Sequence, residues 1–168
     1  KIKPILYTDT GSFIWGENTG GNQCFGTCGV YFNNIVLHPD GGIVVGGNFL
    51  QTYKKQGGTI VSGQGDWDVM LLRYDSNGSQ MWTYHAGGAG DDRLQALSVN
   101  AKGQIQFGGN HFDTMKFGTT NLQKNTTTNK YDAFIAQIDF DSDFQWAISL
   151  GGADNDTTGA LLSMSDGS

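Results

Sequence analysis

Three aspartates near the end of the chain alternate in the way that calcium ligands do. Asp139, Asp141 and Asp143 occupy every second position, like the first ligands of a calcium loop. The glycine and the distal glutamate that complete such a loop are absent from this stretch. Because the matching positions elsewhere in the chain are typical of hairpin turns, we predict a turn here, with a calcium site as the alternative.

The three histidines could serve as bases or metal ligands, but the sequence does not group them. His38, His85 and His111 fall at three different positions of the internal repeat described below, so we expect surface or turn roles. The sequence contains no GxSxG, HExxH or phosphate-loop motif, and we therefore predict no catalytic residue and no cofactor. An enzyme would require residues such as His38, Asp40 and Asp166 to converge on a pocket.

The two cysteines lie close together in the sequence. Cys24 and Cys28 could form a disulfide that closes a small loop in an exported protein, or they could stay as thiols. Two cysteines without a nearby histidine do not make a zinc site, which usually has four ligands. We predict a local disulfide if the protein is exported. So short a ring constrains the unfolded chain only modestly.

Composition and charge exclude several classes of protein. The 168 residues include 26 glycines, two prolines and one glutamate, which favours a β protein with many turns. The formal net charge is −6 and the basic residues are scattered, so we predict no nucleic-acid partner. No apolar run is long enough to span a bilayer. The chain begins at Lys1 rather than Met, and we expect it to be a processed or excised piece.

An internal repeat organises the whole chain. A phrase with a turn, a tryptophan and a glycine pair occurs three times, over residues 8–21, 75–88 and 139–152. Its tryptophans are 67 and 64 residues apart, and residues 68–103 align without gaps on residues 132–167. Repeats of this length are typical of solenoids and propellers.

Each repeat reads as four short strands separated by turn dipeptides such as Asp-Gly, Lys-Gly and Asn-Gly, which predicts an antiparallel meander. In residues 69–72 and 133–136 both alternating faces are apolar, so the sheets must be covered on both sides. Four-stranded sheets stacked face to face around an axis satisfy this requirement. The predicted fold is therefore all-β, with the meanders forming the blades of a β-propeller.

The recurring residues then have structural explanations. We expect each tryptophan to fill the gap between neighbouring blades, and each glycine pair to end its strand. The aspartates of "GGAGDD" and "GGADND" would accept backbone N–H bonds in the turn between blades, with a calcium ion as the alternative. These predicted structural residues are Trp15, Trp82, Trp146, Gly87, Gly88, Gly151, Gly152, Asp92 and Asp156, joined in the turns by Asp91 and Asp154.

The repeat resembles a known family. The stretches "DAFIAQIDFDSDFQWAISLGGADND" and "GQIQFGGNHFDTMKFGTTNL" are similar to the bacterial β-propeller repeats called SBBP repeats. The resemblance covers nearly the whole chain. The first copy departs from it, because Lys1 stands where the other copies have Asp and the cysteine loop is inserted. The resemblance implies a secreted or cell-surface bacterial protein, in which the repeats carry no common catalytic site.

The repeat divides the chain into two complete blades and two partial ones, an incomplete propeller. A propeller ring typically has four to eight blades. We therefore expect the open ends to be covered by the remainder of a longer chain or by a partner chain. Within the blades, the segments 49–67 and 112–131 are expected to be exposed polar connections. The predicted parts are the outer strands at 1–21, the blades at 30–88 and 92–152, and the inner strand at 158–168.

For function, the recurrent residues favour a non-enzymatic propeller segment that acts as a scaffold or a binding and adhesion module. One alternative is part of a propeller enzyme that acts on extracellular polysaccharide. Another is a protein–protein interaction module that uses the long connections inside the blades. The sequence does not identify the protein or glycan ligand, since a fold alone does not imply one.

Overall fold

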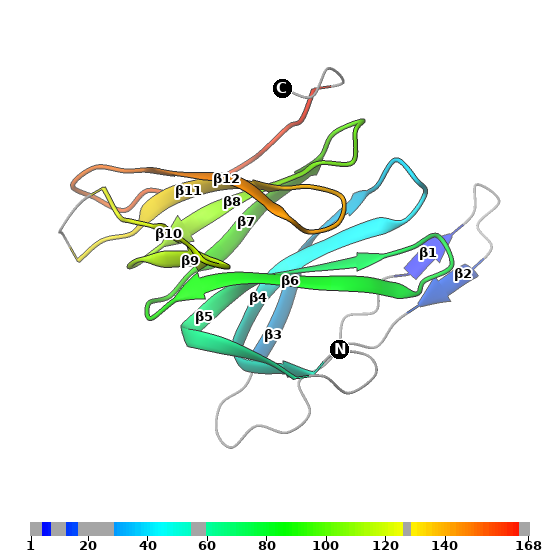
Figure 1. Cartoon of the computed structure of the whole chain (residues 1–168), viewed down its shortest axis with the longest axis horizontal. Helices are drawn as coiled ribbons and strands as arrows, with labels where there is room; N and C mark the ends of the chain where they lie inside the picture. Colours follow the sequence, from blue (N-terminus) through cyan, green and yellow to red (C-terminus); the bar gives the residue numbers. More distant parts are fainter. Residues whose placement is uncertain (1–4, 8–12, 17–28, 55–59, 126–128, 165–168) are drawn as a thin grey trace.

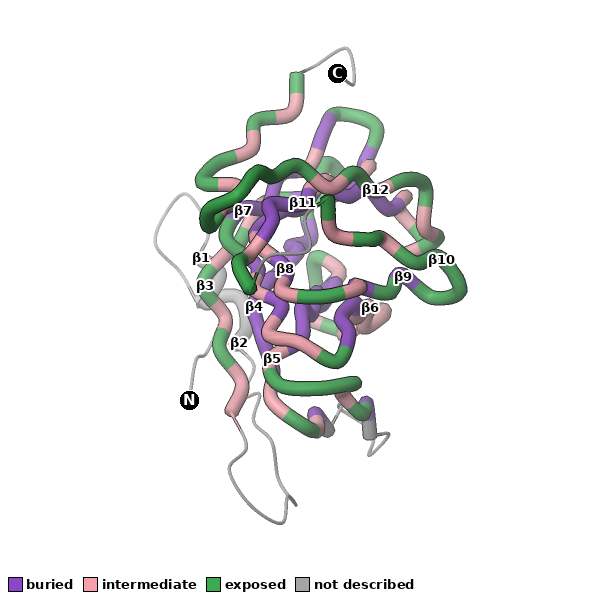
Figure 2. The backbone as a smooth tube through the Cα atoms, turned by 90° about the vertical axis from the view of Figure 1, so that its left-hand side faces the viewer, coloured by how far each residue is buried: buried purple, intermediate pink, exposed green. Residues whose placement is uncertain are grey.

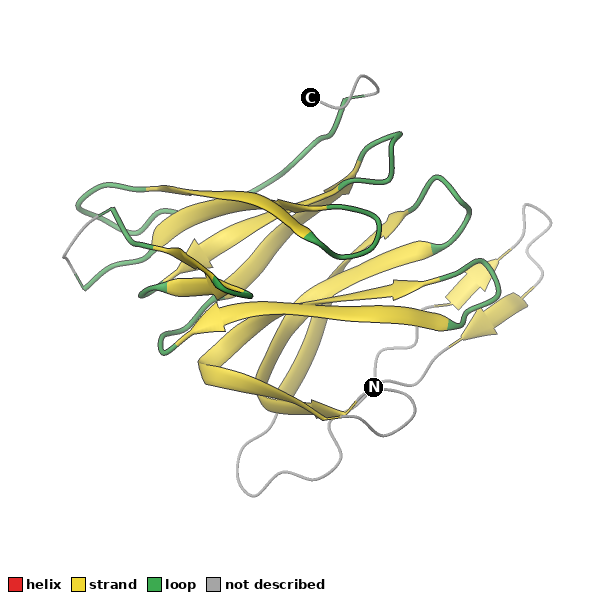
Figure 3. Ribbon diagram, in the orientation of Figure 1, coloured by secondary structure: helices red, strands yellow, loops and turns green. Residues whose placement is uncertain are grey.

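The computed structural model describes residues 5–7, 13–16, 29–54, 60–125 and 129–164, and for β1 and β2 it describes the backbone alone. These residues form twelve strands and no helix (Figure 3), which confirms the all-β prediction for this part of the chain. None of the described residues therefore belongs to a helix that could cross a membrane.

The first large sheet begins with a four-stranded meander. Its strands are β3 (Gly29–Leu37), β4 (Ile43–Lys54), β5 (Ile60–Tyr74) and β6 (Gln80–Gly88), and each is antiparallel to its neighbour. Tight turns join β3 to β4 and β5 to β6, and Gly41 and Gly78 take positive φ angles of 88° and 84° there. These are the hairpins that the Asp-Gly and Asn-Gly dipeptides predict.

The second sheet repeats the same meander. It consists of β7 (Arg93–Val99), β8 (Ile105–His111), β11 (Asp132–Ile138) and β12 (Phe144–Leu150), again all antiparallel. A separate two-stranded sheet pairs β1 (Ile5–Tyr7) with β2 (Phe13–Gly16).

The connection between β8 and β11 does not remain with its own sheet. Its strands β9 (Met115–Phe117) and β10 (Thr120–Leu122) form a hairpin, and β9 pairs with β6 at the edge of the first sheet. We call residues 112–122 the arm. The strand order of the first sheet is therefore β10-β9-β6-β5-β4-β3, as Figure 1 shows.

The expectation that both long connections would be exposed is wrong in part. Met115 and Phe117 of the arm are buried, because alternate residues of β9 point into the core. In the other connection, Phe49, Tyr53 and Val61 are also buried, since β4 and β5 continue through much of it. Both segments are polar in composition, but they carry hydrophobic residues two or four positions apart, and these residues are buried on one face of the strands.

The main core lies between the two large sheets. One face of the first sheet packs against one face of the second, and the arm closes one side of the core. Buried residues follow the strands through the interior in Figure 2. The buried core residues are Val44, Val69, Leu71, Ala86, Leu94, Leu97, Ile105, Phe107, Met115, Phe117, Phe134, Ala136 and Ile138.

The outer faces of the two sheets differ. A second buried cluster on the other face of the first sheet includes Phe49, Met70 and Leu72. On the outer face of the second sheet, residues 158–164 run across β8 and β7, where Thr158 donates its N–H to the Gly109 carbonyl (3.0 Å). Ser163 also donates its N–H to the hydroxyl of Ser98 (2.9 Å). Both large sheets are open, and their arrangement as blades of a propeller remains a prediction.

Candidate interaction site at the sheet junctions

The residues that recur in the repeat meet where one sheet ends and the next begins. We call the group of Asp68, Gly87, Gly88 and Asp92 the first junction. There the Gly88 N–H donates to Asp92 Oδ2 (2.7 Å), and the Asp92 N–H donates to the Trp67 carbonyl (2.7 Å). These bonds fix the turn that leads from β6 into β7.

The first junction buries two carboxylates. Burial is the main cause that raises the pKa of Asp92 to about 7, and the nearby charges of Asp68 and Asp91 raise it further. N–H bonds from Gly88 and Phe112 oppose this shift. Burial likewise raises the pKa of Asp68 to about 6, although its Oδ2 accepts the Gln64 N–H (2.7 Å). Its Oδ1 is buried without a hydrogen-bond partner.

The second junction is formed by Asp132, Gly151, Gly152 and Asp156. The Gly152 N–H donates to Asp156 Oδ2 (2.8 Å), and the Asp156 N–H donates to the Tyr131 carbonyl (2.9 Å). Each bond repeats one of the first junction 64 residues later. The glycine and aspartate of the turn therefore make the local bonds that the sequence predicts.

The segment that follows each junction docks differently: it is strand β7 after the first junction, whereas residues 158–164 after the second form no strand. At the first, Asn48 Oδ1 accepts the N–H of Leu94 (2.7 Å), which ties β7 to the first sheet. Asn110 and Thr158 are the equivalent pair at the second junction, but the Thr158 N–H donates to the Gly109 carbonyl instead. Asn110 Oδ1 is left buried without a partner. Residues 158–164 thus lie over the second sheet without an equivalent of the Asn48–Leu94 bond that ties β7 to the first sheet.

The three repeat tryptophans have different surroundings. Trp82 packs against the main core, and its Nε1–H donates to the Phe140 carbonyl in the second sheet (2.9 Å). Trp146 is 38% exposed, and no sheet among the described residues faces it. Its expected role between two sheets therefore stays a prediction. The side chain of Trp15 lies outside the described residues.

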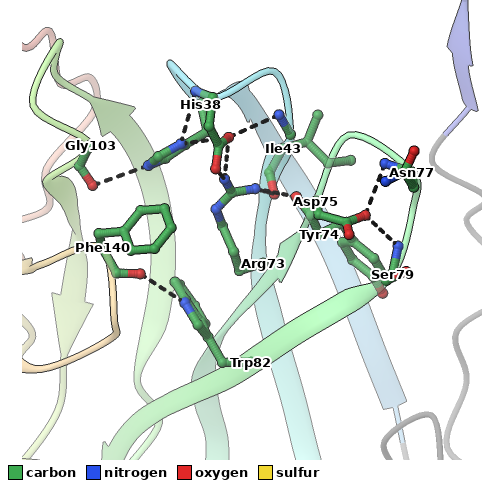
Figure 4. A network of polar contacts seen from close by, with 12 residues as sticks. His38, Ile43, Arg73, Tyr74, Asp75, Asn77, Ser79, Trp82, Gly103 and Phe140 are labelled. Atoms are coloured by element: carbon green, nitrogen blue, oxygen red, sulfur yellow. Dashed lines mark hydrogen bonds and ion pairs between the residues drawn. The ribbon is translucent and has the colours of Figure 1, made fainter.

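A charged cluster near the turns departs from the repeat (Figure 4). Asp40 bonds the His38 ring (Nδ1, 2.8 Å) and accepts two bonds from Arg73, one of them 2.5 Å long. Arg73 is fully buried and also donates to the carbonyls of Ile43 and Tyr74. Partial burial alone would raise the pKa of Asp40, but hydrogen bonds and the Arg73 charge lower it to about 2.

The cluster joins the two sheets and leaves His38 without a free nitrogen. His38 Nε2 lies 3.3 Å from the Gly103 carbonyl, and the ring centroids of His38 and Phe140 are 5.2 Å apart. Both ring nitrogens therefore have partners, and the contacts of His38 link a turn of the first sheet to a turn of the second. Asp166 lies outside the described residues. Arg73 was missed by sequence reasoning, although a charged residue inside the apolar run "VMLLRY" is a signal.

The other histidines do not join this cluster. Of the expected surface or turn roles, His111 lacks the first because it is fully buried. It bonds the Asp113 carbonyl two residues later (2.7 Å) and the Ser149 hydroxyl (2.9 Å). Burial lowers the pKa of its imidazole. His85 is half-buried, with its ring edge-on to Phe49.

The calcium candidates form a hairpin turn. Asp139 Oδ1 accepts the N–H groups of Asp141 (3.1 Å) and Asp143 (2.9 Å), as Asp75 does for the equivalent residues of its own turn. Ser142 takes a φ of 72°, where the equivalent residue of the other turn is Gly78. Among the described residues, no three acidic, histidine or cysteine side chains are grouped so that they could hold a metal. Cys24 and Cys28 lie outside this part of the chain.

Two surface cavities flank the first junction. One, of about 320 Å³, is lined by acidic and aromatic residues that include Asp66, Asp91 and Tyr131. The other, of about 350 Å³, lies between β3 and β7 and is lined by residues such as Tyr31, Asn33 and Arg93. Neither is lined by His38 or Asp40, so the charged cluster does not open into either cavity.

The chain was compared with protein-family models and with known proteins. No family model matches the chain. Over 115 residues it is 28% identical to a protein of Caulobacter vibrioides named regulatory protein FlaEY. That match covers 66% of this chain but 12% of the Caulobacter protein, so the chain corresponds to a small part of that relative's length.

Proposed function

We propose that the chain is a segment of a β-propeller and acts as a non-catalytic scaffold or binding module of a secreted or cell-surface bacterial protein. The observation that carries the proposal is the repeated junction. The same bonds, from Gly88 to Asp92 and from Gly152 to Asp156, follow the last strand of each four-stranded meander. A turn that recurs in this way is suited to stacking sheets in series.

The outer face of the second sheet supports the same proposal. Trp146, Ile148 and Leu150 of β12 are exposed, and so are Leu162 and Met164 beyond it. Several large apolar side chains exposed along one strand are typical of a surface that another element covers. In the proposed role a further sheet of the same kind covers this surface, and the cavities beside the first junction remain open to a ligand.

The charged cluster provides the test against the enzyme alternative. The chain would be incubated with a panel of bacterial exopolysaccharides, and both retention on the immobilised polymer and release of reducing ends would be measured. We expect retention of the chain without release. Release of reducing ends that is lost in His38→Gln and kept in a His85→Gln control would contradict the proposal and favour the enzyme.

A further inference from the structure

Gly88 is a glycine because the arm lies against it. β6 pairs with β9 through Gly87 and Lys116 and through Gly88 and Met115. A Cβ atom on Gly88 would overlap the carbonyl oxygen of Thr114, at the start of the arm. The edge of β6 therefore accepts the arm only where the edge residue has no side chain.

Gly152 occupies the same repeat position without that neighbour. A Cβ atom on Gly152 would meet no described heavy atom within 4 Å. Gly151 differs, because a Cβ atom there would press on the side chain of Asp132, as one on Gly87 would press on Asp68. The described residues thus explain three of the four junction glycines and leave Gly152 without a steric reason.

We propose that the end of β12 at Gly151–Gly152 is a docking edge for the arm of a further repeat, one that follows this segment in a longer polypeptide. The ligand is a short β-hairpin that adds to the sheet edge through main-chain hydrogen bonds. Alternate apolar side chains of that hairpin would point toward the second sheet, as Met115 and Phe117 point into the main core. The inference rests on the proposed stacking of repeats.

A further observation agrees with a missing neighbour at this edge. Leu150, just before the glycine pair, is 48% exposed, whereas its counterpart Ala86 is fully buried in the main core. In the first sheet, the main core that the arm closes covers this position.

The chain's own arm supplies the probe. A fluorescein-labelled peptide with the sequence of residues 112–122 would be titrated with the full chain, and binding followed by fluorescence anisotropy. We expect saturable binding that weakens at least about tenfold in Gly152→Val. The matched control is Gly159→Val, since a Cβ on Gly159 also meets nothing within 4 Å. Gly159 follows Thr158, which bonds β8 and β11 rather than β12. A peptide with Asp in place of Met115 and Phe117 should not bind.

The outcomes separate this inference from the proposed function. Absence of binding, or binding that Gly152→Val leaves unchanged, would overturn the docking edge. Binding that Gly152→Val leaves unchanged would mean that the peptide had displaced the chain's own arm from β6. Neither result bears on the stacking of sheets, which the association state of the chain tests independently. Thermal unfolding of Gly152→Val should match that of the wild-type chain, which would show that lost binding is not lost folding.

Discussion

Asp92 and Asp156 hold equivalent turns at nearly equal hydrogen-bond lengths, yet their surroundings differ. Asp92 is 1% exposed, and beside its turn the arm covers the end of β6. Asp156 is half-buried, and the Gly152 N–H that it accepts is exposed. The repeat therefore determines the local bonds of a junction, while burial and charge depend on whether a neighbouring sheet is present.

The largest difference in stability between the two junctions should come from valine substitutions of Gly88 and Gly152. Gly88→Val is expected to lower the free energy of unfolding by about 3 kcal/mol, because the new side chain overlaps the Thr114 carbonyl and displaces the arm. Gly152→Val should change it by less than about 0.5 kcal/mol. Urea denaturation of the two variants would measure the difference. Equal losses would mean that the two junctions are equivalent in solution.

Alanine substitutions of Trp82 and Trp146 should differ in their effect on stability by a smaller amount. Trp82→Ala is expected to cost about 2 kcal/mol, below the usual range for a fully buried tryptophan because Trp82 is half-buried. Trp146→Ala should cost about 1 kcal/mol or less, since its ring is exposed and faces no described sheet. The same denaturation experiment applies. A larger loss of stability for Trp146→Ala than for Trp82→Ala would contradict the finding that Trp82 packs against the main core while Trp146 is exposed.

Two buried carboxylates of the first junction should make stability depend on pH. The pKa values of Asp68 and Asp92 are raised from 3.8 to about 6 and about 7, so above about pH 4 the folded chain keeps protons on these groups that the unfolded chain has lost. Their contribution to stability is therefore fully present below about pH 4 and is lost as the pH rises to about 7. We expect Asp92→Asn to reduce this loss by at least about 1 kcal/mol, since one pKa unit corresponds to about 1.4 kcal/mol.

The control for the pH effect is Asp156→Asn at the second junction. Asn keeps an oxygen that can accept the glycine N–H in either variant, so the turn itself should survive. Denaturation midpoints between pH 4 and pH 8 would be compared with those of the wild-type chain. If Asp92→Asn left the pH dependence of the midpoint unchanged, or if both variants changed it equally, Asp92 would not be the source of the pH effect.

The sequence predicted the features that depend on local bonds. The Asn77-Gly78 turn and the alternating aspartates of residues 139–143 form hairpins because their side chains bond their own backbone. The arm and Arg73 could not be predicted in the same way. Pairing of β9 with β6 depends on a contact between repeats, and the burial of Arg73 depends on Asp40, which is 33 residues away. The exposure of Trp146 likewise depends on a neighbour rather than on the repeat.

The central claim is that the second junction is an unfinished copy of the first. Size-exclusion chromatography with light scattering, over a range of concentrations, tests it most directly. We predict concentration-dependent association of this chain, reduced by Ile148→Ser and Leu150→Ser. Ile148 and Leu150 of β12 are exposed, whereas the equivalent face of β6 packs in the main core. A stable monomer at every concentration, unaffected by these substitutions, would contradict the claim.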